Sequence, residues 1–204
     1  IQPDKPFPDL GDKGILICTA EILPLADPHV EPGPPTEDVI ELARVVDRGI
    51  RETEMIDLHQ LVLIENKSVI GIFIDSSVID ADGNLFDACS YASVAALLSC
   101  TVPKYEIKDD APALVEGVTS KPPVTTLPVS VTMARIGDYI IVDPTSEEEA
   151  CMDARMTITT NSAGNICALQ KGGSDGFSAE QLVQCSEIAL RVGTKIRKQF
   201  EQLM

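Results

Sequence analysis

The chain has 204 residues, 44% of them apolar, and its 32 acidic and 16 basic side chains give a formal net charge of −16. Such a chain can bury a full core as one large domain or two small ones, which excludes a disordered protein. The charge argues against a protein that coats nucleic acid by itself, because that binding depends on phosphate neutralisation by Lys and Arg. A local basic site, with a partner that supplies more positive charge, remains compatible with it.

Location and redox state are predicted from what the sequence lacks. It has no apolar run of about eighteen residues, and its first residues, IQPDKPFPDL, do not resemble a signal peptide. We therefore expect a cytoplasmic protein with no membrane association. The six cysteines lie far apart without a CxxC pair, and the chain has two histidines, so we expect no metal site but reduced, mostly buried thiols. These are Cys18, Cys89, Cys100, Cys151, Cys167 and Cys185.

The first half of the chain has a mixed α and β pattern. Residues 14–22, GILICTAEI, predict a buried strand. The sequence EPGPPTED then breaks the strand, and Thr36 is suited to be the N-cap of a helix predicted over residues 37–54. Residues 68–75, SVIGIFID, predict a second strand, and after the turn DADG the sequence LFDACSYASVAALLSC predicts a helix buried on more than one side.

The second half predicts strands followed by a helix. PVSVTMARIGDYIIVDP and ARMTITTNSAGNICALQ are each typical of a β-hairpin, with turns at 137–138 and 161–165. A long helix is expected after Ser178, where SAEQ is a capping box. The prediction is an α+β protein with sheet packed on helix. Its proline-rich segment VEGVTSKPPVTTLP suggests a division into residues 1–120 and 121–204.

Three arginines share one face of the helix predicted over residues 37–54. At about 100° per residue, Arg44, Arg48 and Arg51 fall within an arc of roughly 60°. The face can be solvated and hold weak ion pairs, Asp47–Arg51 and Arg48–Glu52. It can also be an anion or phosphate site, because the planar guanidinium matches phosphate and neighbouring like charges favour an outside partner. The predicted buried face consists of Val39, Leu42, Ala43, Val46 and Ile50, with Ile40 as a misfit.

Two acidic clusters could bind a metal. The first resembles part of a calcium loop but lacks the regular D-x-D-x-D-G spacing, so a strand-to-helix turn is the favoured interpretation. It comprises Asp75, Asp80, Asp82, Gly83 and Asn84. The second, Glu147, Glu148 and Glu149, could hold a metal or act as acid and base, but a solvated loop is the default. Neither His29 nor His59 has a nucleophile beside it, so these residues alone do not define an enzyme.

Four long segments, in order, resemble the RNase PH family, and within it the non-catalytic RNase PH-like subunits of archaeal exosome rings. They are AEILPLADPHVEPGPPTEDVIELARVVDRGIRETEMIDL, FIDSSVIDADGNLFDACSYASVAALL, LPVSVTMARIGDYIIVDPTSEEEA and TITTNSAGNICALQKGG. The resemblance implies an RNase PH-type fold. It also implies that an N-terminal piece, about a quarter of a typical member, is missing in front of Ile1.

The chain departs from the catalytic members of that family at three places. Their D-G-G-T-R turn, whose Arg helps bind phosphate, matches residues 82–86 and ends here in Phe86. Their two acidic residues six apart match Glu149 and Arg155, so a cation replaces the second carboxylate. Their phosphate-binding Ser and Gly match Thr132 and Ala134. The resemblance therefore implies a subunit without catalysis and without a cofactor.

The resemblance also implies partners and a role for the arginines. In the family the equivalent helix faces the RNA path, so Arg44, Arg48 and Arg51 would grip the backbone of single-stranded RNA. The partners would be a catalytic RNase PH-like paralogue, in a ring of three pairs, and RNA-binding cap proteins. Two alternatives stay open. One is a self-sufficient phosphorolytic exoribonuclease or tRNA-processing enzyme that uses Glu149 and Asp153, and the other is a purely structural ring spacer.

Overall fold

The first sheet of the computed structural model, which describes residues 1–203, is built around one long strand, β4 (Ser68–Val78). Strand β2 (Ile15–Ile22) runs parallel to β4, and both confirm predicted strands. Two short strands that the sequence did not predict, β1 (Gln2–Asp4) and β3 (Val62–Ile64), pair antiparallel with β4. A 3-10 helix, η1 (Leu58–Leu61), precedes β3.

Helix α1 (Glu37–Arg51) begins as predicted but ends three residues earlier than expected. Thr36 caps it by accepting a hydrogen bond from the Val39 amide at 3.4 Å. The chain leaves the helix because Glu54 adopts a left-handed conformation with φ +53°, which directs the fully buried Met55 back into the core. Ala43 is only half-buried, and the buried face is Val39, Leu42, Val45, Val46, Gly49 and Ile50.

The turn before helix α2 (Leu85–Ser99) is the predicted strand-to-helix connection. Gly83 is required there, because its φ is +84° and a Cβ would lie 2.4 Å from the Pro144 carbonyl oxygen. Asn84, at the N-cap, is also left-handed, with φ +44°. A hairpin that the sequence analysis missed follows α2, formed by β5 (Val102–Lys108) and β6 (Ala111–Ser120).

The second sheet is antiparallel, with the order β10-β9-β7-β8. Both predicted hairpins are confirmed, as β7 (Val129–Ile136) with β8 (Tyr139–Val142) and β9 (Ala154–Thr160) with β10 (Ile166–Gly172). The expected acidic loop between them was wrong, because residues 146–151 form a short helix, α3 (Ser146–Cys151). Thr145 and Glu148 make a capping box that starts this helix.

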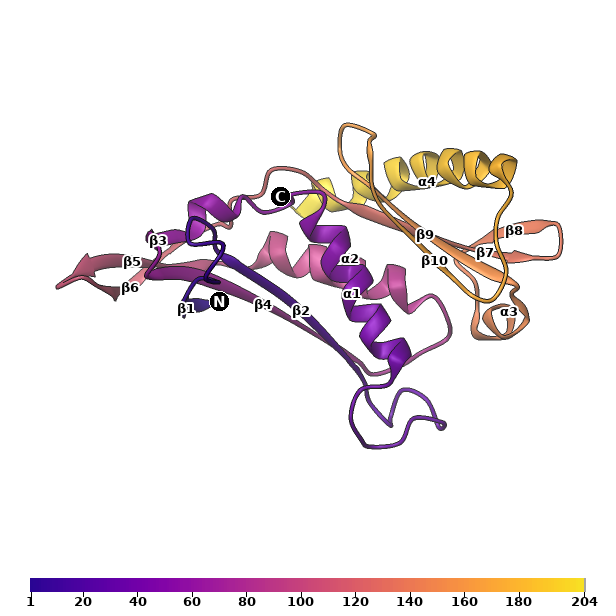
Figure 1. Cartoon of the computed structure of the whole chain (residues 1–204), viewed down its shortest axis with the longest axis horizontal. Helices are drawn as coiled ribbons and strands as arrows, with labels where there is room; N and C mark the ends of the chain where they lie inside the picture. The colour runs from indigo at the N-terminus through magenta and orange to yellow at the C-terminus, as the bar shows by residue number, and fades with distance from the viewer. Residues whose placement is uncertain (204) are drawn as a thin grey trace.

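The helices cover opposite faces of the second sheet. Gly49 of α1 lies against the side chains of Ser130 and Thr159. Helix α4 (Ala179–Phe200), which starts with the predicted Ser178–Gln181 capping box, lies against the other face. In Figure 1, α1 and α2 occupy the middle of the molecule, between the first sheet and the second. One continuous apolar core joins residues of both sheets and helices α1, α2 and α4.

The last turns of α4 close this core. Phe200 packs edge-on against Tyr91 of α2, with ring centroids 5.9 Å apart. Arg197 is buried and donates hydrogen bonds to the carbonyl oxygens of Leu127 and Thr160 at 2.9 and 3.0 Å. The chain then ends its described part with η2 (Glu201–Leu203). These contacts attach the helix to α2, to the end of β9 and to the segment just before β7.

All six thiols are free, as expected, but their burial is uneven. Cys89 and Cys185 are buried, whereas Cys151 is exposed and the other three are half-buried. Burial raises the pKa of Cys18 to about 12. Among residues 1–203, no helix is both long and apolar enough to cross a membrane.

Candidate nucleic-acid interface

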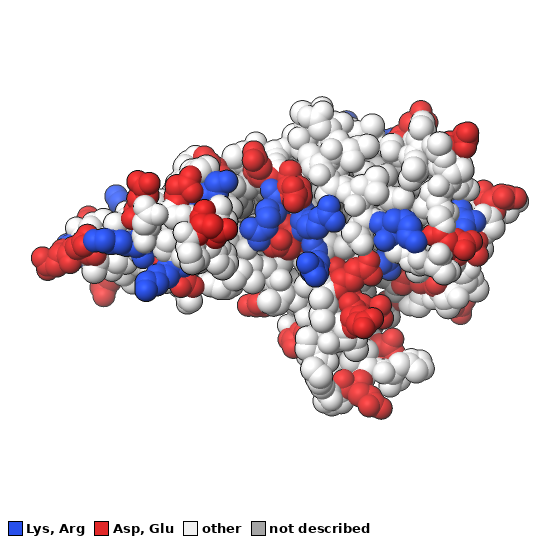
Figure 2. Space-filling view, in the orientation of Figure 1, with Lys and Arg blue, Asp and Glu red and all other residues white. Residues whose placement is uncertain are grey.

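Two arginines project from the outer face of α1. Arg44 and Arg48 are both exposed, one turn apart. Together with Glu41 and Gln170 they border a surface hollow of about 450 Å³ between α1 and β10. Figure 2 shows basic atoms gathered over the middle of this face, with acidic atoms on either side. The geometry is a short cationic strip on an otherwise acidic molecule.

Arg51 does not share this strip, although the sequence placed it on the same face. Its guanidinium donates to both carboxylate oxygens of Asp47, at 2.9 and 2.7 Å, and to the Leu16 carbonyl oxygen at 2.5 Å. The hydrogen bonds that Arg51 donates to Asp47 hold the pKa of Arg51 above its usual value. Arg51 therefore links α1 to β2, and the predicted Asp47–Arg51 ion pair is confirmed.

The carboxylate of Glu41, which borders the same hollow as the strip, is already paired. Glu41 forms an ion pair with Arg155 of β9 at 3.0 Å and accepts a hydrogen bond from the Gln170 amide at 3.3 Å. Arg48 donates to Gln170 at 3.3 Å, and the predicted ion pair of Arg48 with Glu52 does not form. Within the described residues Arg44 has no hydrogen-bond or ion-pair partner. Both arginines are thus free to bind an external anion.

Three positions at which the chain departs from the catalytic members, Phe86, Glu149 and Arg155, lie together beneath the strip. The guanidinium of Arg155 stacks on the ring of Phe86, 3.9 Å from its centroid. Burial raises the pKa of Glu149, and the charge of Arg155 opposes that rise. Ala134 lies directly opposite Arg155 across the β7–β9 pair and is fully buried. An aromatic ring and a paired cation thus occupy the positions to which the sequence resemblance assigned phosphate binding in the catalytic members.

Thr132 is fully buried and contacts other protein groups instead of facing an open site. Its hydroxyl donates to Asp87 at 2.8 Å and lies 2.9 Å from the hydroxyl of Thr157. Asp87 also accepts from the Thr132 amide and from the Asn84 side chain, at 2.9 and 3.0 Å. Burial raises the pKa of Asp87 to about 6 despite these hydrogen bonds. The network is a closed polar cluster between α2 and the second sheet.

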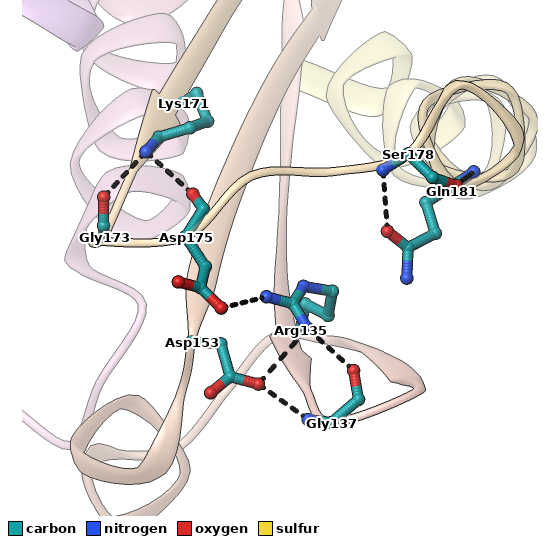
Figure 3. A network of polar contacts seen from close by, with 8 residues as sticks. All are labelled: Arg135, Gly137, Asp153, Lys171, Gly173, Asp175, Ser178 and Gln181. Atoms are coloured by element: carbon teal, nitrogen blue, oxygen red, sulfur yellow. Dashed lines mark hydrogen bonds and ion pairs between the residues drawn. The ribbon is translucent and has the colours of Figure 1, made fainter.

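Asp153, the second carboxylate of the alternative enzyme, belongs to a different network. It accepts from the Gly137 amide at 2.8 Å and from Arg135 at 3.3 Å, and Arg135 also pairs with Asp175 at 3.0 Å. Figure 3 shows the two aspartates converging on Arg135 beside the β7–β8 turn. These contacts fasten the turn to the segment before α4, so Asp153 serves as a structural anchor.

Neither acidic cluster forms a metal centre in the described part of the chain. No group of three or more His, Cys, Asp or Glu side chains within residues 1–203 is arranged to hold a metal ion. Asp75 instead accepts a hydrogen bond from Thr19 at 2.6 Å, and Glu148 caps α3. His29 and His59 lie at separate exposed positions, beside Asp27 and Asp12.

The fold defines an RNase PH-type protein. A chain of the Archaeoglobus fulgidus exosome with RNA bound to the active site is 41% identical, with a TM-score of 0.89, over 98% of this chain and 76% of that one. A chain of an archaeal exosome core is 38% identical, with a TM-score of 0.83, over 98% of this chain and 74% of that one. The rice protein Rrp46, 16% identical with a TM-score of 0.65 over 95% of this chain and 75% of that one, shares the fold.

The sequence comparisons show the family. The profiles of the 3′ exoribonuclease family match residues 1–103 for its domain 1 and residues 126–192 for its domain 2. The exosome complex component Rrp42 of Thermococcus gammatolerans is 46% identical, over 97% of this chain and 73% of that protein. The exosome complex component Rrp42 of Methanopyrus kandleri is 44% identical, over 97% of this chain and 74% of that protein. The chain therefore belongs to the RNase PH family of 3′ exoribonucleases.

Proposed function

We propose that the chain is a non-catalytic subunit of an exosome ring, which binds RNA backbone and shapes the active site of a paired catalytic subunit. The names of its relatives support the assembly, since they are exosome components and one solved exosome holds RNA at its active site. The partners would be a catalytic RNase PH-like paralogue, RNA-binding cap proteins and single-stranded RNA, in the cytoplasm. The ring would degrade RNA from its 3′ end by phosphorolysis.

The observation that carries the non-catalytic assignment is that Arg155, paired with Glu41, stacks on Phe86. Phosphorolysis needs a bound phosphate as nucleophile and groups that stabilise charge at the reacting phosphorus. Phe86 offers no anion ligand, Arg155 is neutralised by Glu41, and Thr132 is buried. The self-sufficient enzyme would use Asp153, which instead pairs with Arg135. We therefore propose that the chemistry belongs to the paired subunit.

The RNA-binding assignment is placed on Arg44 and Arg48. They are exposed, one turn apart and without a carboxylate partner, so they suit two phosphates of a backbone. Arg51 is less suited, because its guanidinium is used by Asp47 and Leu16. Contacts of this kind position a strand without reading its sequence.

One experiment tests the binding role. In the ring assembled with its catalytic subunit, in phosphate-free buffer, an Arg44→Glu/Arg48→Glu variant is titrated with fluorescein-labelled oligo(A) at several salt concentrations. We expect affinity about tenfold weaker or worse, and a slope of log K against log salt reduced by about 1.4, at about 0.7 per phosphate contact in single strands. The matched control is Arg191→Glu/Lys195→Glu on α4, an exposed pair with the same spacing. Unchanged affinity of the α1 variant would favour the structural spacer.

A second experiment tests the absence of chemistry. The purified chain alone, incubated with RNA and inorganic phosphate, is expected to release no nucleoside diphosphate. The catalytic subunit under the same conditions provides the positive control. Release by the chain itself would establish the self-sufficient exoribonuclease.

A further inference from the structure

Arg155 of β9 lies in a narrow slot on the second sheet. Its side chain is only 11% exposed, and its neighbours on the two adjacent strands are small, Ala134 on β7 and Gly172 on β10. A Cβ at Gly172 would come within 2.6 Å of the Arg155 guanidinium. Phe86 supports the guanidinium from its stacked face. The slot therefore fixes the direction in which the positive charge points.

That charge holds Glu41. One carboxylate oxygen of Glu41 lies 3.0 Å from Arg155, and the other accepts from Gln170, which in turn accepts from Arg48. Arg155, Glu41, Gln170 and Arg48 thus form a continuous series of contacts from β9 to the cationic strip. Among the described residues, Glu41 therefore forms its ion pair with Arg155 and not with the arginines that follow it on the same helix.

A released Glu41 would have an obvious alternative partner. Arg44 follows it by three residues, a spacing at which opposite charges on a helix attract. Glu41, Arg44 and Arg48 also border the same hollow, so the carboxylate needs no backbone movement to reach the strip. An ion pair there would neutralise part of the surface available to a phosphate backbone.

We infer that Arg155 is a positioning residue for RNA binding: by holding Glu41 it keeps Arg44 and Arg48 without a carboxylate partner. The inference rests on the proposed function and deepens it. The residue that replaces the family's catalytic carboxylate thus gains a role of its own, because it preserves the charge of the neighbouring strip. Arg155 acts through Glu41 and does not itself need to touch RNA.

The test compares Arg155→Met with Arg155→Met/Glu41→Gln in the assembled ring, with oligo(A) in phosphate-free buffer. We expect Arg155→Met to weaken binding about three- to tenfold and to reduce the salt slope by about 0.7, the equivalent of one phosphate contact. The double variant should recover both values to within about twofold. Arg155→Met/Glu187→Gln has the same net charge, with the change at an exposed α4 carboxylate, and should remain weak.

A second route avoids the loss of Arg155 itself. Gly172→Ala should displace the guanidinium through the close contact and reproduce the weaker binding, and Glu41→Gln should again restore it. Circular dichroism and gel filtration verify folding and ring assembly for every variant. Recovery by Glu187→Gln as well, or failure of Glu41→Gln to restore the slope, would overturn the inference. Either result leaves the proposed function standing if Arg44→Glu/Arg48→Glu weakens binding, so the two failures are distinguishable.

Discussion

Replacing Asp87 by Asn is expected to stabilise the protein at neutral pH. Asp87 is 5% exposed, and burial raises the pKa of its carboxyl group from 3.8 to about 6. An amide can keep the local hydrogen bonds: its oxygen accepts from Asn84 and the Thr132 amide, and its nitrogen donates to the Thr132 hydroxyl. That hydroxyl can then donate to Thr157, 2.9 Å away.

The magnitude follows from the two pKa values of Asp87. The carboxyl group has a higher pKa in the folded protein, so its contribution to stability is complete below pH 3.8 and is lost as the pH rises through about 6. The loss amounts to ~3 kcal/mol at pH 7.5, at about 1.36 kcal/mol per pKa unit. Asp87→Asn has no such loss, so its free energy of unfolding should exceed the wild-type value by up to ~3 kcal/mol.

Urea denaturation of both proteins at pH 5 and pH 7.5 provides the measurement. The difference in their free energies of unfolding should narrow by about half at the lower pH, because the wild-type carboxyl group becomes protonated in the folded state. Asp87→Ala is the control that removes all the hydrogen bonds, and it should destabilise at both pH values. A difference independent of pH would refute the reasoning, as would an Asn variant less stable than wild type at pH 7.5.

Two further predictions concern side chains near α1. Arg51→Met should lower the free energy of unfolding by about 1–2 kcal/mol, because it loses hydrogen bonds between α1 and β2, while RNA affinity of the ring stays within about twofold. Chemical denaturation and RNA titration measure the two effects. A loss of RNA affinity as large as that of Arg44→Glu/Arg48→Glu would contradict the prediction. Since the pKa of Cys18 rises from 9.0 to about 12, its alkylation by iodoacetamide at pH 8 should be about a thousandfold slower than in the unfolded chain. Peptide mass spectrometry should show the exposed Cys151 labelled first, and rapid labelling of native Cys18 would be the contrary result.

Local patterns predicted most of the regular elements. The apolar periodicity identified α1, the apolar residues on most faces identified α2, and the Ser178 capping box marked the start of α4. The same capping signal, Thr145 followed by Glu148, precedes α3, although the acidic composition of this segment favoured a solvated loop. The β5–β6 hairpin also had a local signal, the pair Asp109–Asp110. Aspartate tolerates the left-handed conformation that a tight turn requires, and both residues adopt it.

The candidate site could be predicted only in part. Helical spacing placed Arg44, Arg48 and Arg51 on one face, but it could not show that Arg51 reaches the Leu16 carbonyl on a strand far away in the sequence. The partnership of Glu41 and Arg155 likewise depends on the packing of α1 near β9 and β10, which no local pattern contains. Spacing finds which residues share a helix face, whereas the three-dimensional fold decides which of their charges remain free.

The closing role of α4 has a consequence for synthesis. Phe200 and Arg197 contact Tyr91, Leu127 and Thr160, all of which leave the ribosome well before the last turns of the helix. Until those turns emerge, α4 does not fully cover one face of the second sheet, and the nascent chain exposes aggregation-prone apolar surface. Correct packing of the second sheet therefore depends on the synthesis of the last turns of α4, and a product that ends before Arg197 would be a client for chaperones.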